Sequence, residues 1–282
     1  MSDLITSPPT VPGIYPDIPI EVYHGDLASL SFSWAKKLLP PSCPAKFHAE
    51  RTSQRGYVKH FNDGHAVHTR VLGEGPEIVV IDAPDWRTAA ARAARDQALA
   101  EGKTPLLKHE DEMTRAMAAA VHDHPQAAAL LAEGKAEQSL YWVDPETWIR
   151  LRTRPDWITE QRGRRVFVDY KTTKSAAPGI FRASAGDFGY HQQAAFNVAG
   201  AREVLDEDVR VVFIAQEKEP PYLVSVHEWS PEDLEIGAAL NRLAIDIYAA
   251  CMAEDYWPGY GDDIHQLRLT SKARYFAEEL LR

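Results

Sequence analysis

Cysteine is scarce in this sequence, and long apolar runs are absent. Cys43 and Cys251 are its two cysteines, too few for a disulfide framework, a four-cysteine zinc site or an iron–sulfur cluster. No apolar run approaches the roughly 20 residues needed to cross a bilayer, and the N-terminal residues lack the basic and apolar regions of a secretory leader. We therefore expect a soluble, cytoplasmic protein without a membrane partner.

Basic residues are fewer than acidic ones. The 282 residues include 31 Lys and Arg and 41 Asp and Glu, for a formal net charge of −10. Because affinity for phosphates comes largely from lysine and arginine, this balance argues against a general nucleic-acid coat protein. It is compatible with a nuclease, since a basic channel can coexist with an acidic exterior. Six arginines do fall within sixteen positions: Arg150, Arg152, Arg154, Arg162, Arg164 and Arg165.

The length and the 45% hydrophobic content are sufficient for one large core, and nothing forces a division into independent domains. We expect a single domain of residues 1–282. Along the chain we expect an extended lead-in, a mainly helical region, an α/β core and a C-terminal helix, at residues 1–30, 31–135, 136–260 and 261–282.

Composition and periodicity predict helices before residue 135 and mixed elements after it. The first helices are expected at residues 31–39, 62–73, 89–100 and 110–132. A period-two pattern then predicts three consecutive strands of a meander, at residues 137–143, 147–153 and 165–171. A helix at 187–201, strands at 209–215 and 222–228, and a long helix at 231–256 follow. The fold class is therefore α/β, with a central mixed sheet flanked by helices and an N-terminal helical elaboration.

The most informative stretch is the apolar strand that carries Asp169 and Lys171. Side chains at i and i+2 leave a strand on the same face, so this carboxylate and ammonium point into one pocket. Folding the chain about residues 160–165 places Asp156 opposite the neighbourhood of Asp169, where cross-strand Cβ atoms lie roughly 5 Å apart. Two carboxylates at that distance can share a metal ion. The alternative for Asp169 and Lys171 is a structural salt bridge.

Five segments in this order resemble the PD-(D/E)XK nuclease superfamily, and within it the RecE-type exonucleases (exonuclease VIII) and their phage relatives. The segments are Leu30–Ser33, Gly64–His68, Arg154–Asp156, Asp169–Thr173 and Gly189–Gln193. The likeness covers about residues 20–260. Asp-x-Lys alone is a weak signal, and its weight comes from the order of the five segments.

The resemblance implies a role for each matching residue. Asp156 and Asp169 become metal ligands, and Lys171 the residue that orients the attacking water. His68 is similar to a histidine that helps to hold a metal or the phosphate, and we prefer it to His65 on the same helix. Glu137 is similar to an acidic residue that precedes the two aspartates. Without the resemblance, His68 would more often be a structural histidine and Glu137 an exposed strand residue.

The helix after Lys171 supplies the last match. Relatives use a glutamine followed four positions later by a tyrosine to brace the site and touch DNA. Here Asn197 stands four positions after Gln193, where relatives have the tyrosine. We still expect Gln193 to brace the site. Tyr190 either takes the role of that tyrosine or is an ordinary packed aromatic. We also expect Arg152 and Arg154 to contact DNA, a solvated strand face being the alternative for each.

The resemblance implies hydrolysis of a DNA phosphodiester by water with Mg²⁺, for which Mn²⁺ can substitute. Lys171 would act by charge, because an unperturbed lysine is almost fully protonated at pH 7. The expected substrate is a double-stranded DNA end, degraded from 5′ to 3′ to leave a 3′ single strand for an annealing protein or recombinase. Relatives form a ring around DNA, so a homo-oligomeric ring is implied.

Other functions stay open from the sequence. A restriction-like or structure-selective endonuclease would use the same residues, and only dependence on a DNA end separates it from an exonuclease. A nuclease with an iron–sulfur cluster is opposed by the two cysteines. A non-catalytic DNA-binding module is opposed by the presence of Asp156, Asp169 and Lys171, because a pure binder has little reason to bury like charges.

Overall fold

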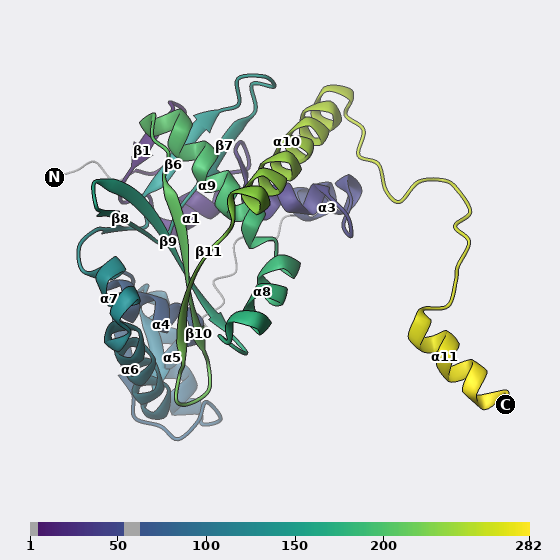
Figure 1. Ribbon diagram of the computed structural model, residues 1–282. Helices are drawn as coiled ribbons and strands as arrows, with labels where there is room; N and C mark the ends of the chain where they lie inside the picture. Colours follow the sequence, from purple (N-terminus) through teal and green to yellow (C-terminus); the bar gives the residue numbers. More distant parts are fainter. Residues whose placement is uncertain (1–4, 54–62) are drawn as a thin grey trace.

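A five-stranded mixed sheet forms the centre of the computed structural model (Figure 1). The structure describes the backbone of residues 5–53 and 63–282 and the side chains of 5–53 and 66–282, so the side chain of His65 lies outside the described residues. Strand β9 is parallel to β10, and the other neighbours are antiparallel. The order is β11 (Val224–Glu228), β10 (Arg210–Glu217), β9 (Arg164–Thr173), β8 (Trp157–Gln161) and β5 (Lys135–Ala136). This confirms the expected fold class.

The apolar run of β9 is buried on both faces. Val166 and Val168 face one core with α4 (Asp63–Leu72), α6 (Lys108–Asp123) and α7 (Pro125–Leu131). Phe167 faces the other core with α8 (Pro178–Asp187) and α9 (Tyr190–Leu205). Figure 1 shows these two groups of helices on opposite sides of the long strands. Because side chains alternate along a strand, Asp169 and Lys171 leave β9 on the α9 side.

The predicted meander is wrong, because its first two strands belong to a second sheet. That sheet has the order β1 (Gly13–Tyr15), β6 (Ser139–Val143), β7 (Arg150–Thr153) and β2 (Leu30–Ser31). The strand β8, which was not predicted, enters the central sheet and pairs with β9. Pro155 lies between β7 and β8, and a proline cannot donate a ladder hydrogen bond. The chain therefore changes sheets at this point.

The N-terminal half is helical, with three further corrections. The helix expected at 110–132 is divided by Pro125, which begins α7, since proline breaks the helical hydrogen-bond ladder. A parallel pair of strands, β3 (Ile78–Ile81) and β4 (Thr104–Leu107), flanks the predicted α5 (Ala89–Ala100). The lead-in contains β1 and the short helix α1 (Ile20–Gly25). Short helical segments precede α4, namely α2 (Phe32–Ala35), η1 (Lys36–Leu38) and α3 (Pro44–Thr52).

The C-terminal region holds the long helix α10 (Pro231–Glu254) and α11 (Ser271–Leu280), which begins ten residues later than the expected boundary at 261. Helix α10 is long and apolar enough to span a bilayer by length and composition, which corrects the expectation that no segment approaches that length. Core helices of soluble proteins pass the same test. Here Ala244, Ile245 and Tyr248 of α10 pack in a core with Phe196 of α9.

Candidate active site

Asp156 directly precedes β8, which pairs with the central strand β9. Trp157 pairs with Val168, so Asp156 lies next to this pair, in the neighbourhood of Asp169. The Oδ2 atom of Asp156 accepts a hydrogen bond from the backbone N–H of Tyr170 at 2.7 Å. This bond anchors the carboxylate on β9.

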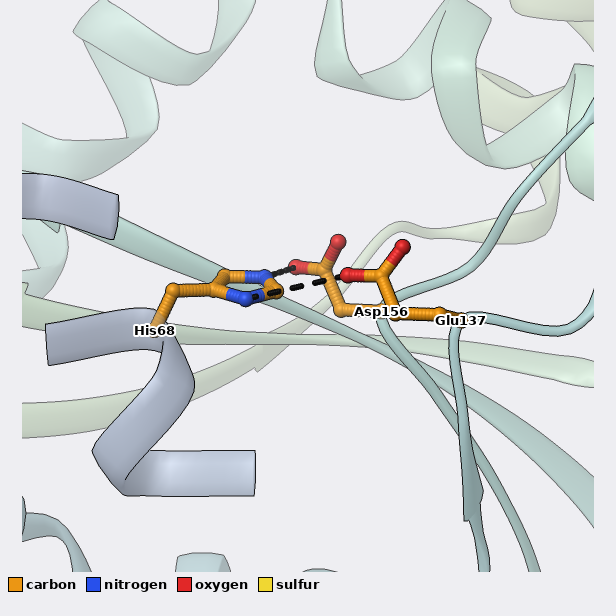
Figure 2. Close-up of side chains that lie close together, drawn as sticks. All are labelled: His68, Glu137 and Asp156. Carbon is orange, nitrogen blue, oxygen red and sulfur yellow. Dashed lines mark ion pairs between the residues drawn. The ribbon is translucent and has the colours of Figure 1, made fainter. Parts of the chain in front are cut away.

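Three candidate ligands from distant segments meet beside this strand. His68 of α4 places its Nε2 atom 3.2 Å from Asp156 Oδ2 and its Nδ1 atom 3.8 Å from Glu137 Oε1 (Figure 2). One ligand atom from each of His68, Glu137 and Asp156 lies within 4.8 Å of the others. Figure 2 shows the imidazole and both carboxylates directed toward one another. The three side chains therefore form one potential cation site.

Glu137 reaches this position through an unusual backbone conformation. It lies between β5 and β6 with a φ of 50°, in the left-handed region. Its backbone N–H donates to the carbonyl oxygen of Asp156 at 3.1 Å. A non-glycine residue held in this region costs of order 1–3 kcal/mol. The surrounding structure thus holds Glu137 next to Asp156 at an energetic cost.

Asp169, the fourth predicted metal ligand, forms an ion pair instead of joining the group of three. Lys171 Nζ lies 2.6 Å from Asp169 Oδ2, and Gln193 of α9 donates to Asp169 Oδ1 at 3.1 Å. Asp169 is 2% exposed. The Lys171 ammonium also lies 5.1 Å from the ring centroid of Tyr190. The structure therefore brings together a second cluster, which adjoins Asp156 across the β8–β9 pair and contains Asp169, Lys171, Gln193 and Tyr190.

The charges of the two clusters shift one another's protonation. Burial lowers the pKa of His68, but Asp156 and Glu137 outweigh it and raise this pKa to about 9. Burial and Asp156 raise the pKa of Glu137 to about 6. Burial acts to raise the pKa of Asp156, but the charge and the hydrogen bond of His68 outweigh burial and hold this pKa below its ordinary value. At neutral pH without a metal, His68 is thus a cation between two carboxylates.

Lys171 is held in its charged form. Burial lowers its pKa, but Asp169 and Asp156 outweigh burial and raise it above the ordinary lysine value. Burial raises the pKa of Asp169 to about 6, although Lys171 opposes this shift. A lysine so placed supplies a fixed positive charge and hydrogen-bond donors, and it is a poor general base near neutral pH.

The two arginines expected to contact DNA have different positions, and neither is on a solvated strand face. Arg152 is 1% exposed, donates to the carbonyl oxygens of Asp26 and Ser29, and pairs with Asp26 Oδ2 at 3.1 Å. A guanidinium enclosed in this way cannot reach a phosphate, so the prediction for Arg152 is wrong. Arg154 lies at the site. Its Nη1 atom is 3.7 Å from Glu137 Oε2, and its guanidinium lies over the ring of Tyr23.

A cavity of about 430 Å³ opens onto the group of three and Lys171. Arg154 lines it, and α1 forms a further wall with Ile20, Tyr23 and His24. The sequence predicted an extended lead-in at this segment and no site residue within it. Its apolar positions Ile18, Ile20 and Tyr23, of which Ile18 and Tyr23 are buried, were the available signal of a packed segment.

The family described as a PDDEXK-like domain of unknown function (DUF3799) matches residues 31–270. The chain belongs to this family. The expected PD-(D/E)XK superfamily is therefore confirmed, whereas the narrower RecE type stays a prediction. No curated protein matches the sequence of this PDDEXK-like chain.

Solved structures resemble the PDDEXK-like chain to different extents. One is described as a "Putative exonuclease" from Eubacterium rectale, with a TM-score of 0.59 and 12% identity, over 88% of this chain and 92% of that chain. At this identity the similarity shows the fold alone. Another is SSO0001, with 14% identity over 66% of this chain and 85% of that chain, and its TM-score of 0.28 is too low to support an argument.

The donor atoms of the PDDEXK-like site fit a divalent cation. Carboxylate oxygens such as those of Glu137 and Asp156 suit Mg²⁺ and Mn²⁺, whereas the imidazole of His68 suits Mn²⁺ better than Mg²⁺. The carboxylates of Asp156 and Glu137, 3.2 and 3.8 Å from the two ring nitrogens of His68, make this position favour positive charge. Asp169 is not part of the group, and its oxygens already have Lys171 and Gln193 as partners.

Proposed function

We propose that this protein is a metal-dependent DNA exonuclease that hydrolyses phosphodiester bonds from the ends of double-stranded DNA. The observation that carries the proposal is the position of the Asp169–Lys171 pair beside the group of His68, Glu137 and Asp156. Family membership supports a nuclease. Dependence on DNA ends rests on the resemblance to RecE-type exonucleases, and the Eubacterium rectale protein that shares the fold is itself described as a "Putative exonuclease".

In this proposal, His68, Glu137 and Asp156 hold Mg²⁺ or Mn²⁺. A divalent ion in such a site supplies Lewis-acid charge and a more acidic bound water. Lys171 keeps its proton and presents its ammonium to the phosphate, where fixed charge stabilises the negative charge that develops during cleavage. Gln193 holds Asp169, and Asp169 in turn holds the Lys171 ammonium in place.

We further propose degradation from 5′ to 3′, which leaves a 3′ single strand for homologous recombination. A single-strand annealing protein or a recombinase would be the partner that receives this strand, and a homo-oligomeric ring around the duplex would keep the enzyme on DNA. The polarity of degradation, the partner protein and the ring all follow from the resemblance to RecE-type exonucleases.

Digestion of linear duplex DNA labelled at the 5′ end of each strand, alongside closed-circular duplex DNA, tests the proposal. We expect short labelled products from linear DNA only, with Mg²⁺ or Mn²⁺. The Lys171→Ala variant should release none, whereas Lys174→Ala, which removes an exposed lysine three positions away, should cleave normally. Cutting of the circle would identify an endonuclease. Absence of cleavage with either metal would contradict the proposed activity and support a DNA-binding module.

A further inference from the structure

Helix α10 carries an apolar stripe along the edge of its buried side, where the helix surface passes from the core to solvent. Ile236, Leu240, Leu243 and Ile247 are spaced four, three and four residues apart, which places them on one side of the helix. Ile236 is 56% and Leu243 49% exposed, and Leu240 and Ile247 are partly buried. Ile236 and Leu243 therefore extend the apolar surface of Leu240 and Ile247 out to solvent, and exposed apolar residues joined in this way mark a contact surface.

Helix α11 has an apolar face and no partner in the part of the chain that the structure describes. Ala273, Phe276, Ala277 and Leu280 share one side of this helix, and none of its ten residues is buried. Phe276 is 65% and Leu280 72% exposed. A helix of ten residues is marginal in water without tertiary packing. Figure 1 shows α11 apart from the body of the molecule, at the end of an extended segment.

The two helices have complementary charge. Residues 231–255, which contain α10, include six Asp and Glu and one arginine. Residues 266–282, which contain α11, include four Lys and Arg and two glutamates. Complementary charge promotes encounter and fixes orientation between two surfaces whose apolar parts supply the affinity.

We propose that α11 of one copy packs its apolar face on the α10 stripe of a second copy, so that two chains exchange their C-terminal segments. The partner is therefore another molecule of this protein. In a symmetric pair the contact forms twice, which doubles the apolar area that one short helix can bury.

The segment between the helices favours exchange over packing within one chain. Its start is fixed on α3, where the ring of Trp257 stacks on His48 at 4.6 Å and the Pro258 carbonyl accepts the N–H of Ala45 at 3.0 Å. Residues 259–270 then run without a helix or strand, a span of up to about 40 Å. Helices that pack within one chain are usually joined by about 2–8 residues, and a longer arm suits a neighbouring molecule.

Four single substitutions in the 282-residue chain, followed by gel filtration with light scattering, test this proposal. Phe276→Asp and Leu243→Asp place a carboxylate in the proposed contact and should each weaken association at least tenfold. Tyr275→Asp and Met252→Asp change exposed residues of the same helices that lie off the two apolar faces, and association should be unchanged. Circular dichroism verifies that each variant is folded.

Mixing distinguishes exchange from packing within a chain. The Phe276→Asp chain keeps an intact α10, and the Leu243→Asp chain keeps an intact α11, so the mixture should form a pair that neither variant forms alone. A monomeric unmodified protein, or equal effects of all four substitutions, would overturn the proposal. So would failure of the mixture to associate, or binding of the unmodified protein to anionic vesicles through Phe276 without self-association.

Discussion

The Nε2 atom of His68 lies 3.2 Å from Asp156 Oδ2, the same oxygen that accepts the backbone N–H of Tyr170. One carboxylate oxygen thus links the helix α4 to the central strand β9. Because this pairing stabilises the protonated imidazole, a proton and a metal ion compete for the same site.

This competition predicts that metal affinity depends on pH. The pKa of His68 is raised to about 9, since the adjacent carboxylates outweigh burial. Between about pH 7 and pH 9, the affinity for Mn²⁺ should rise about tenfold per pH unit and then level off. Glu137, whose pKa is about 6, is already ionised in this range. Isothermal titration calorimetry measures the slope, which His68→Gln should abolish. A slope that persists in this variant would contradict the assignment.

Removal of Lys171 should affect stability as well as cleavage. Lys171→Met leaves the buried Asp169 without its counter-charge, a change that costs about 3–5 kcal/mol while Asp169 stays ionised. Protonation of Asp169 relieves this cost, so the loss of Tm should be larger at pH 8 than at pH 5. Thermal unfolding in EDTA measures both values.

The double variant Asp169→Asn/Lys171→Met is the control for this effect. It removes both charges, so its Tm should recover toward that of the unmodified protein, while cleavage stays absent. A double variant less stable than Lys171→Met would show that the ion pair is not the source of the loss.

Gln193 should act through Asp169 and not through DNA affinity. Its side chain donates to Asp169 Oδ1 at 3.1 Å. Gln193→Leu removes this donor, and the loss of a group that orients an active-site residue typically reduces activity about 10–100-fold. We expect this loss in kcat, with an unchanged Kd for DNA measured in Ca²⁺. A weaker Kd with an unchanged kcat would assign Gln193 to DNA binding.

Arg152 should stabilise the fold through its buried ion pair with Asp26. Arg152→Met leaves Asp26 buried without its charge partner, which should reduce the free energy of unfolding by about 3–5 kcal/mol. Arg164→Met, at an exposed arginine that donates to the Asp208 carbonyl, should change it by less than about 0.5 kcal/mol. Urea unfolding compares the two. Equal, small effects would show that the buried pair contributes little.

The crossing of α9 and α10 depends on Gly237. A Cβ atom at this position would lie 2.5 Å from the backbone oxygen of His191, so Gly237→Ala should destabilise the fold by about 1–3 kcal/mol. A Cβ atom added at Gly186 in α8 would have no neighbour within 4 Å, so Gly186→Ala should stabilise the fold by about 0.5–1 kcal/mol. Thermal unfolding of both variants tests this difference, and a stabilised Gly237→Ala would show that the helices can separate at no cost.

Local signals were sufficient for several elements and for one part of the site. Helix α5 has the predicted bounds, and α10 begins as expected after Ser230, whose Oγ accepts the N–H of Asp233 at 3.2 Å. The spacing of Asp169 and Lys171 placed them on one face, because alternation is a property of any strand. The short turn between β8 and β9 was enough to bring Asp156 into the neighbourhood of Asp169, because Trp157 pairs with Val168.

The sequence by itself therefore determined the α/β class, the strand that carries Asp169 and Lys171, and the motif residues of the superfamily. Only the tertiary structure decided that Asp169 pairs with Lys171 while His68 and Glu137 join Asp156, that Arg152 is buried against Asp26, and that Tyr23 lines the site. The physical reason is that spacing and propensity act over a few residues. Burial, charge pairing and the division of β6–β9 between two sheets depend on contacts between segments far apart in the chain.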